Sequence, residues 1–85
     1  MDWIIEVTWE AAITEVRIDH RLVANGEMVA CDADFDVVWT SAGSVMAADG
    51  LIEGEQSPTV VWPHGTPAPV TVRPVTRLSG PLAGS

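Results

Sequence analysis

Hydrophobic and polar residues alternate along the start of the chain in the period-two pattern that is typical of half-buried β-strands. Between Trp3 and Trp9 every odd-numbered residue is apolar, whereas Glu6 and Thr8 between them are polar. From Val16 onward the apolar residues are even-numbered. The change of phase falls within residues 10–13, where we expect a bend, a bulge or a short connection.

The dipeptide Asn25-Gly26 lies between two such runs and is a preferred centre for a two-residue type I′ turn. With this turn, one face of the paired runs is almost wholly apolar and the other is mostly charged. A slip of one residue would mix the two faces, so the pattern and the turn agree on the register. We therefore expect an antiparallel hairpin with arms at residues 13–23 and 27–40.

The predicted hairpin assigns each residue to a face. The apolar face would carry Leu22, Val29, His20, Cys31, Ile18, Ala33, Val16 and Phe35. The other face would carry an acidic row formed by Glu15, Asp19, Asp32, Asp34 and Asp36, interrupted by Arg17 and Arg21. An arm as long as residues 27–40 usually twists strongly or passes from one sheet to another.

The middle of the chain alternates less clearly. Residues 40–44 form a loop, and residues 44–48 fit either a single helical turn ended by Gly50 or one arm of a second hairpin about Asp49-Gly50. Residues 54–58 indicate another turn, and residues 59–62 a short strand.

Prolines then space out the last part of the chain, which suits an edge strand or an extended arm because proline cannot donate to a β-ladder. The arm has four apolar side chains that could be buried: Val70, Val72, Val75 and Leu78. Their burial alone cannot offset the entropy cost of ordering the arm, so its backbone must also pair with a sheet edge. We expect residues 70–73 to pair as a strand, with Pro74 ending or offsetting the pairing, and we favour the edge of a neighbouring subunit as the partner.

These patterns predict an all-β protein, a small antiparallel sandwich or barrel of about five or six strands built on the Asn25-Gly26 hairpin. Residues 1–62 form the β-rich domain. Residues 63–85 form the extended C-terminal arm, which belongs to the same domain or docks on a neighbour.

Composition adds a reason to expect partners. The chain has 85 residues, of which 47% are hydrophobic and only 19% charged, so its apolar positions exceed what one small core can hide. The net charge is −8, with no lysine, which argues against phosphate binding and hence against direct contact with nucleic acid. The acidity suits solubility, a basic partner surface or imitation of a nucleic-acid backbone.

The cysteine count and the first residues bear on location. Cys31 is the only cysteine, so no internal disulfide forms. The segment that starts at Met1 has no basic region and no long apolar stretch, so we expect neither a signal peptide nor a membrane span. We expect synthesis in the cytoplasm of a host cell and incorporation into a virion.

Candidate metal sites are weak. His20, Cys31 and His64 could supply three zinc ligands or a cysteine–histidine nucleophile pair, but closely spaced ligand pairs and a recognisable catalytic motif are both missing. Asp32, Asp34 and Asp36 match the first half of a calcium loop only in spacing, since Val37 and Gly43 stand where such a loop needs glycine and glutamate. We expect no metal and no cofactor.

Catalytic motifs are also missing. The sequence contains no glycine-rich phosphate loop and no Gly-x-Ser-x-Gly, and nothing places a pair of carboxylates in a pocket. We expect a protein that is not an enzyme.

Four tryptophans stand out in so short a chain. Trp9 and Trp39 end inward-phased runs and are expected in the core. Trp3 and Trp62 lie near a chain end or a turn and are better candidates for an interface. The expected partner-binding residues are Trp3, Asp32, Asp34, Asp36, Trp62, Val70, Val72, Val75 and Leu78.

No motif identifies a family. A small, lysine-free, β-rich chain with a proline-spaced arm suits the subunits of multi-chain shells and tubes such as bacteriophage virions. Our leading hypothesis is a structural subunit of such an assembly, in capsid decoration, head–tail connection or the tail, with partners that include copies of itself. The alternative is a small acidic inhibitor or anti-defence protein that binds a basic protein surface.

Overall fold

The computed structural model describes residues 3–53, 59–62 and 69–78, and these residues form eight β-strands. The strands are β1 (Trp3–Trp9), β2 (Ile13–Ile18), β3 (Arg21–Val23), β4 (Met28–Cys31), β5 (Asp34–Ser41), β6 (Ser44–Glu53), β7 (Thr59–Val61) and β8 (Val70–Arg77). The described residues include no helix, and so none that is long and apolar enough to cross a membrane.

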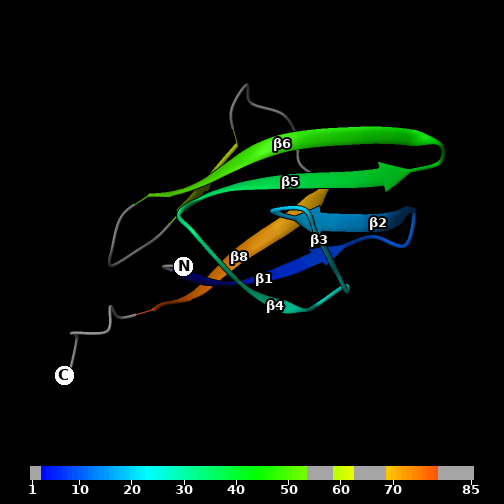
Figure 1. The fold of residues 1–85 in the computed structure, drawn as a ribbon. Coiled ribbons are helices and arrows are strands. Elements are labelled where there is room, and N and C mark those ends of the chain that lie inside the picture. The colour runs from blue at the N-terminus through cyan, green and yellow to red at the C-terminus, as the bar shows by residue number, and fades with distance from the viewer. Residues whose placement is uncertain (1–2, 54–58, 63–68, 79–85) are drawn as a thin grey trace.

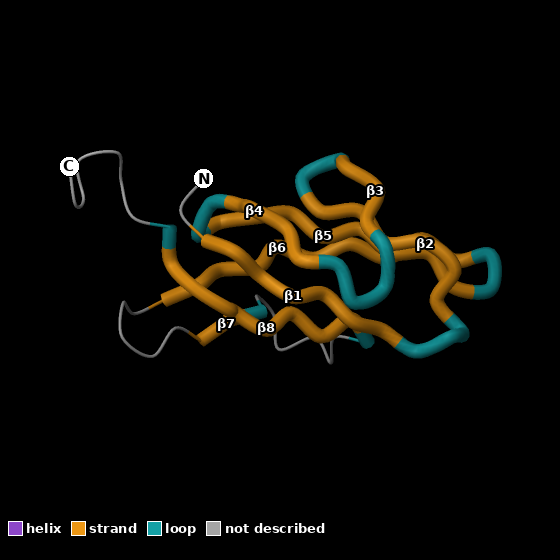
Figure 2. Tube along the Cα trace, turned by 90° about the horizontal axis from the view of Figure 1, so that it is seen from below, coloured by secondary structure: helices purple, strands orange, loops and turns teal. Residues whose placement is uncertain are grey.

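The strands form two antiparallel sheets that pack together, which confirms the all-β prediction (Figures 1 and 2). One sheet has three strands in the order β4-β1-β8, and the other has five in the order β3-β2-β5-β6-β7. The chain therefore has a β-sandwich-like architecture, in which each sheet covers the apolar face of the other.

The core lies between the two sheets. It contains the inward-facing residues of both sheets: Trp3, Ile5, Val7, Ile13, Val16, Ile18, Val23, Val29, Cys31, Phe35, Val37, Trp39, Ile52, Val70 and Val72. Along β1 and β5 these residues alternate with more exposed ones, as the period-two pattern predicts. The described residues include no buried polar or charged residue, so burial of apolar surface provides the stability of this core.

The pairing predicted across Asn25-Gly26 is wrong. β3 pairs with β2, whereas β4 pairs with β1 in the other sheet, where Trp3 lies opposite Cys31. Asn25-Gly26 thus connects two strands that belong to different sheets. The alternation of apolar residues identified the buried faces of β2, β4 and β5, but not which strand lies beside each of them.

The hairpin in this region turns at Asp19-His20 instead. Both residues have positive φ, 49° and 70°, as a two-residue type I′ turn requires. The turn resets the alternation, so that in β3 Val23 is buried and Leu22 is exposed, the reverse of the predicted faces. Aspartate and histidine adopt positive φ more readily than most residues, but they are a weaker turn signal than Asn-Gly.

Asn25-Gly26 still forms a turn, and the amide of Glu27 donates to the carbonyl of Ala24 at 2.9 Å. Only Gly26 has positive φ, 88°, which fits a type II turn and not the hairpin type. The Asn25 side chain docks this turn on β1: its amide nitrogen donates to the Trp9 carbonyl at 2.7 Å, and its oxygen accepts from the Trp9 amide at 3.1 Å. Asn25 thereby imitates a further residue of the β1–β4 ladder.

The long arm predicted at residues 27–40 is divided between the sheets, as arms of that length often are. β4 ends at Cys31 and β5 begins at Asp34, so the chain crosses from one layer to the other at Asp32 and Ala33. The carbonyl of Ala33 accepts from the Ile52 amide at 2.7 Å, which fastens the crossing to β6.

β5 and β6 form the longest hairpin, with a two-residue turn at Ala42-Gly43, and Ser41 lies opposite Ser44. Both alternatives considered for residues 44–50 are therefore wrong, because β6 runs straight through Asp49-Gly50. Gly50 lies opposite Phe35, and a Cβ atom at this position would overlap the phenyl ring. The glycine that suggested a turn is needed for close packing inside a strand.

β8 contains the predicted strand at residues 70–73 and pairs with β1 of its own chain, not with the edge of a neighbour. Its inward residues Val70 and Val72 complete the core. The register shifts after Pro74, where the ladder moves from Ile5 to Ile4. Pro74 is tolerated because β8 is an edge strand and the ladder is irregular at this point.

The hydrogen bonds of Asn25 generate a stability prediction. Asn25→Ala removes both bonds to Trp9 and should lower the free energy of unfolding by about 1–3 kcal/mol, at roughly 0.5–1.5 kcal/mol for each bond. Asn25→Asp keeps the acceptor but places a carboxylate oxygen against the Trp9 carbonyl, so its free energy of unfolding should also be lower than that of wild type. Urea unfolding followed by tryptophan fluorescence measures all three proteins. Equal stability of Asn25→Ala and wild type would contradict this role.

Candidate interaction surface

The five-stranded sheet buries one face in the core and presents the other to solvent, and we call this second face the outer face. The cross-strand partners place the following side chains on it: Glu15, Arg17, Leu22, Asp34, Asp36, Val38, Thr40, Val45, Ala47, Asp49, Leu51 and Val61. The register arranges them in rows that run across the strands.

Apolar rows lie toward both ends of the outer face. One row runs across four strands through Leu22, Arg17, Val38 and Ala47, and Val45 lies two pairs nearer the hairpin turn. Leu22 and Val45 are 60% and 70% exposed. At the opposite end Leu51 and Val61 are cross-strand partners, and both are exposed.

An acidic row separates these apolar rows. Asp36 and Asp49 are direct partners on β5 and β6. A hydrogen bond between their carboxyl groups and the charge of Asp49 raise the pKa of Asp36 above its ordinary value. Asp19 lies beside them, because its carboxylate accepts from the Asp36 amide at 3.0 Å and its amide donates to the Asp36 carbonyl at 2.9 Å.

Three arginine side chains make contacts away from this row. Arg17 pairs with Glu15 at 2.8 Å, and Arg73 pairs with Glu6 on the other sheet at 3.0 Å. Arg21 donates to the carbonyl of Ala30 at 3.2 Å. The centre of the outer face is therefore a strip of negative charge between two apolar regions.

The structure separates the residues predicted to bind partners. Trp3, Val70 and Val72 are buried in the core, so their assignment to an interface is corrected. The prediction for Trp3 relied on its position near the chain end. Its place in the inward-facing alternation of β1 determines its burial instead. Trp62 is half-buried, and its ring packs edge-to-face on Phe35 with 6.5 Å between ring centroids.

The other predicted contact residues are exposed, but they do not form a single patch. Asp34 and Asp36 lie on the outer face, whereas Asp32 lies at the crossing between the sheets. Val75 and Leu78 lie at the end of β8 in the three-stranded sheet and are 38% and 37% exposed.

The histidine–cysteine arrangement that suggested a site does not form. Cys31 lies on β4, opposite Trp3 of β1, whereas His20 lies in the exposed β2–β3 turn. His64 is outside the described residues. Burial and the charges of Asp19 and Asp32 raise the pKa of the Cys31 thiol to about 11, which makes it a poor nucleophile. Within the described ranges, no group of three or more ligating side chains could hold a metal ion.

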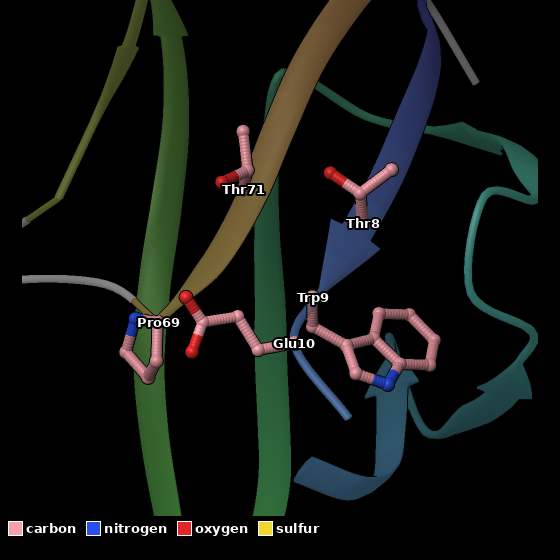
Figure 3. A pocket seen from close by; sticks show the side chains of 5 residues that line it. All are labelled: Thr8, Trp9, Glu10, Pro69 and Thr71. Carbon is pink, nitrogen blue, oxygen red and sulfur yellow. The ribbon is translucent and has the colours of Figure 1, made fainter. Parts of the chain in front are cut away.

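A shallow depression of about 370 Å³ lies where β1 ends and β8 begins. Its lining residues are Thr8, Trp9, Glu10, Pro69 and Thr71. Figure 3 shows Glu10 directed toward Pro69, with the Trp9 ring turned to the other side. Glu10 is the only ionisable group in the lining, so the depression lacks the paired groups that acid–base or nucleophilic chemistry needs.

Sequence reasoning missed the exposed apolar residues Leu22, Val45 and Met46. A signal for the last two was present, because residues 45–48 are uniformly apolar and do not alternate. A strand buried on one face alternates, so an unbroken apolar run in a chain of this size indicates that apolar side chains also point outward.

No protein-family model, curated protein or solved structure matches this chain. The outer face is therefore interpreted from its own chemistry.

The Asp36–Asp49 pair generates a pH prediction. A raised pKa means that folding favours protonated Asp36, so its contribution to stability is greatest at acid pH and is lost as the pH rises through the raised value. Asp36→Asn should therefore raise the melting temperature at about pH 7, and this gain should shrink at about pH 4.

Asp34→Asn is the matched control, because it removes one negative charge from the same strand but Asp34 lies opposite Leu51. Thermal unfolding followed by circular dichroism measures both variants. An equal effect of the two substitutions at both pH values would show that only the net charge matters.

Proposed function

We propose that this protein is a structural subunit of a larger assembly, specifically a bacteriophage virion component in capsid decoration, head–tail connection or the tail. The observation that supports association most directly is the gathering of exposed apolar side chains on the outer face. Leu22, Val45 and Val61 all present their side chains to solvent on one sheet. Apolar patches of this kind mark interaction sites in soluble proteins.

The free energy available from burying these side chains is of the size that an interface needs. Burying a side chain such as valine or leucine contributes roughly 1.5–3 kcal/mol, so three would contribute about 4–9 kcal/mol. Association costs about 4–15 kcal/mol in lost rotational and translational freedom. The outer face therefore supports modest binding alone and tighter binding when several subunits bind together, as they do in a shell or tube. Virion membership rests on this need for many partners and on the lysine-free, β-rich, proline-spaced composition.

The assembly hypothesis predicts that mutation of the outer face weakens association. The double variant Leu22→Ser, Val61→Ser should be lost from sedimented particles of the cells that make the protein, because it removes two exposed apolar side chains from the outer face. Met28→Ser is the control, since Met28 is 56% exposed but lies on the three-stranded sheet. A wild-type chain that stays monomeric and sediments with no particle would count against the proposal.

A second candidate function, an inhibitor that binds a basic protein surface, is favoured by the acidic row. The charge of Asp49 raises the pKa of Asp36, so a cation from a partner would be attracted to this pair. Such binding would weaken steeply as salt screens the charges.

This second candidate predicts that the combined substitution Asp34→Asn, Asp36→Asn, Asp49→Asn abolishes capture of a basic partner, measured by pull-down at low and high salt. The double variant Leu22→Ser, Val61→Ser should leave that capture intact, because it changes no charge. Unchanged capture by the triple variant would remove the inhibitor hypothesis and leave the assembly hypothesis standing.

A further inference from the structure

Among the described residues, no strand pairs with one side of β6 near the β5–β6 turn. β5 pairs with β6 from Ser44 to Leu51, whereas β7 pairs only with Leu51, Ile52 and Glu53. Along residues 44–50, no strand within the described residues lies on the side of β6 away from β5 (Figure 1). The sheet therefore has a free edge at this end.

The hairpin register shows which backbone groups face that edge. In a two-residue hairpin the residues that flank the loop form a hydrogen-bonded pair, and hydrogen-bonded and open pairs then alternate. Even-numbered residues of β6 therefore direct their amides and carbonyls toward β5, as the bond from the Ile52 amide to the Ala33 carbonyl shows. The amides and carbonyls of Val45, Ala47 and Asp49 point to the free edge.

The four outer strands of the two sheets are less suited to pairing. β3 and β7 have three residues each and β4 has four. β8 is longer, but Pro74 lacks a donor, the register shifts beside it, and Arg73 and Arg77 add charge. Short strands, proline, bulges and charges are the features that keep edges from pairing.

Residues 44–48 of the free edge have none of these features. Residues 44–48 include no charge and no proline, and the pairing with β5 is regular throughout. Val45 is 70% exposed, and Met46 is 46% exposed although it points to the inward side of its sheet. The three-stranded sheet therefore leaves this end uncovered, and apolar groups as well as backbone groups are available there.

We propose that two copies of this chain pair antiparallel through the free edges of β6, about a two-fold axis at Met46. Val45 then lies opposite Ala47 of the second copy, and both residues direct their backbone groups across the interface. This proposal rests on the proposed function as a self-associating subunit and identifies the contact. The pairing of the two copies would join their five-stranded sheets into one continuous sheet.

Charge selects this register. Pairing about Met46 brings together only the uncharged residues 44–48, and Asp49 of each copy stays beyond the paired segment. Pairing about Ala47 would place Asp49 opposite Val45 of the second copy and would remove water from a carboxylate beside an apolar side chain. A second copy also supplies an edge of the same length and pattern, because antiparallel pairing of identical segments is self-complementary.

A disulfide test measures the contact directly. Residues that face each other in a pair without hydrogen bonds have Cα atoms about 4.5 Å apart, a separation that a disulfide can bridge. Met46→Cys should therefore form a disulfide-linked dimer under mild oxidation, seen on a non-reducing gel. Leu22→Cys is the matched control and should stay monomeric, because Leu22 is 60% exposed but lies on β3 at the other edge of the sheet.

All variants retain Cys31, whose burial and pKa of about 11 keep it from reacting. Equal cross-linking of Met46→Cys and Leu22→Cys would overturn the contact. Efficient cross-linking by Ala47→Cys with none by Met46→Cys would overturn the register about Met46.

A second variant tests the backbone contribution. Ala47→Pro removes an amide that points away from β5, so the monomer should keep its β-sheet circular dichroism while light scattering shows loss of the dimer. A wild-type chain that stays monomeric as its concentration rises, or an Ala47→Pro chain that stays dimeric, would overturn edge pairing. If Leu22→Ser, Val61→Ser still weakens particle association in that case, the proposed function stands without this contact.

Discussion

The constraint on which this structure depends is that one short chain must supply two apolar sheet faces that bury each other. Its core has no buried polar residue among the described residues, so the sheets are held by the removal of apolar surface from water. The run of residues that ends at Trp39 must serve both layers. It does so by crossing at Asp32 and Ala33, which keeps Cys31 inward in one sheet and Phe35 inward in the other.

That crossing also positions β6. Phe35 lies over Gly50 and against Trp62, and the Ala33 carbonyl accepts from Ile52, so the far end of β6 is fastened to the core. The near end has no such support. It follows β5 past the part of the sandwich that the three-stranded sheet covers, and this leaves Met46 half-exposed on the inward side. The exposed apolar surface is thus a consequence of a hairpin longer than its core.

The sequence predicted the fold class, the limits of β1 and the inward phase of most strands, because side-chain alternation is a local property. It did not predict strand partners. Asn25-Gly26 was expected to pair β3 with β4 in one hairpin. Instead it forms a type II turn, the Asn25 side chain binds the backbone of Trp9, and β4 belongs to the other sheet. Which strands pair depends on tertiary contacts that a turn dipeptide does not encode. The same limit applies to the candidate surface: the position of Leu22 on the outer face follows from the Asp19-His20 turn, whose weak local signal concealed it.

The distribution of charge relates the free edge of β6 to the outer face. If two copies stacked their outer faces, the Asp36–Asp49 pairs would approach each other and bring four carboxyl groups together. Edge pairing about Met46 avoids this approach, since the carboxylates remain in solvent on either side of the axis. The acidic row therefore disfavours self-stacking while it leaves the apolar rows beside it accessible. An outer face of this kind suits a partner that differs from the chain itself and brings its own cations, so copies would join at the edge and the assembly would bind at the face.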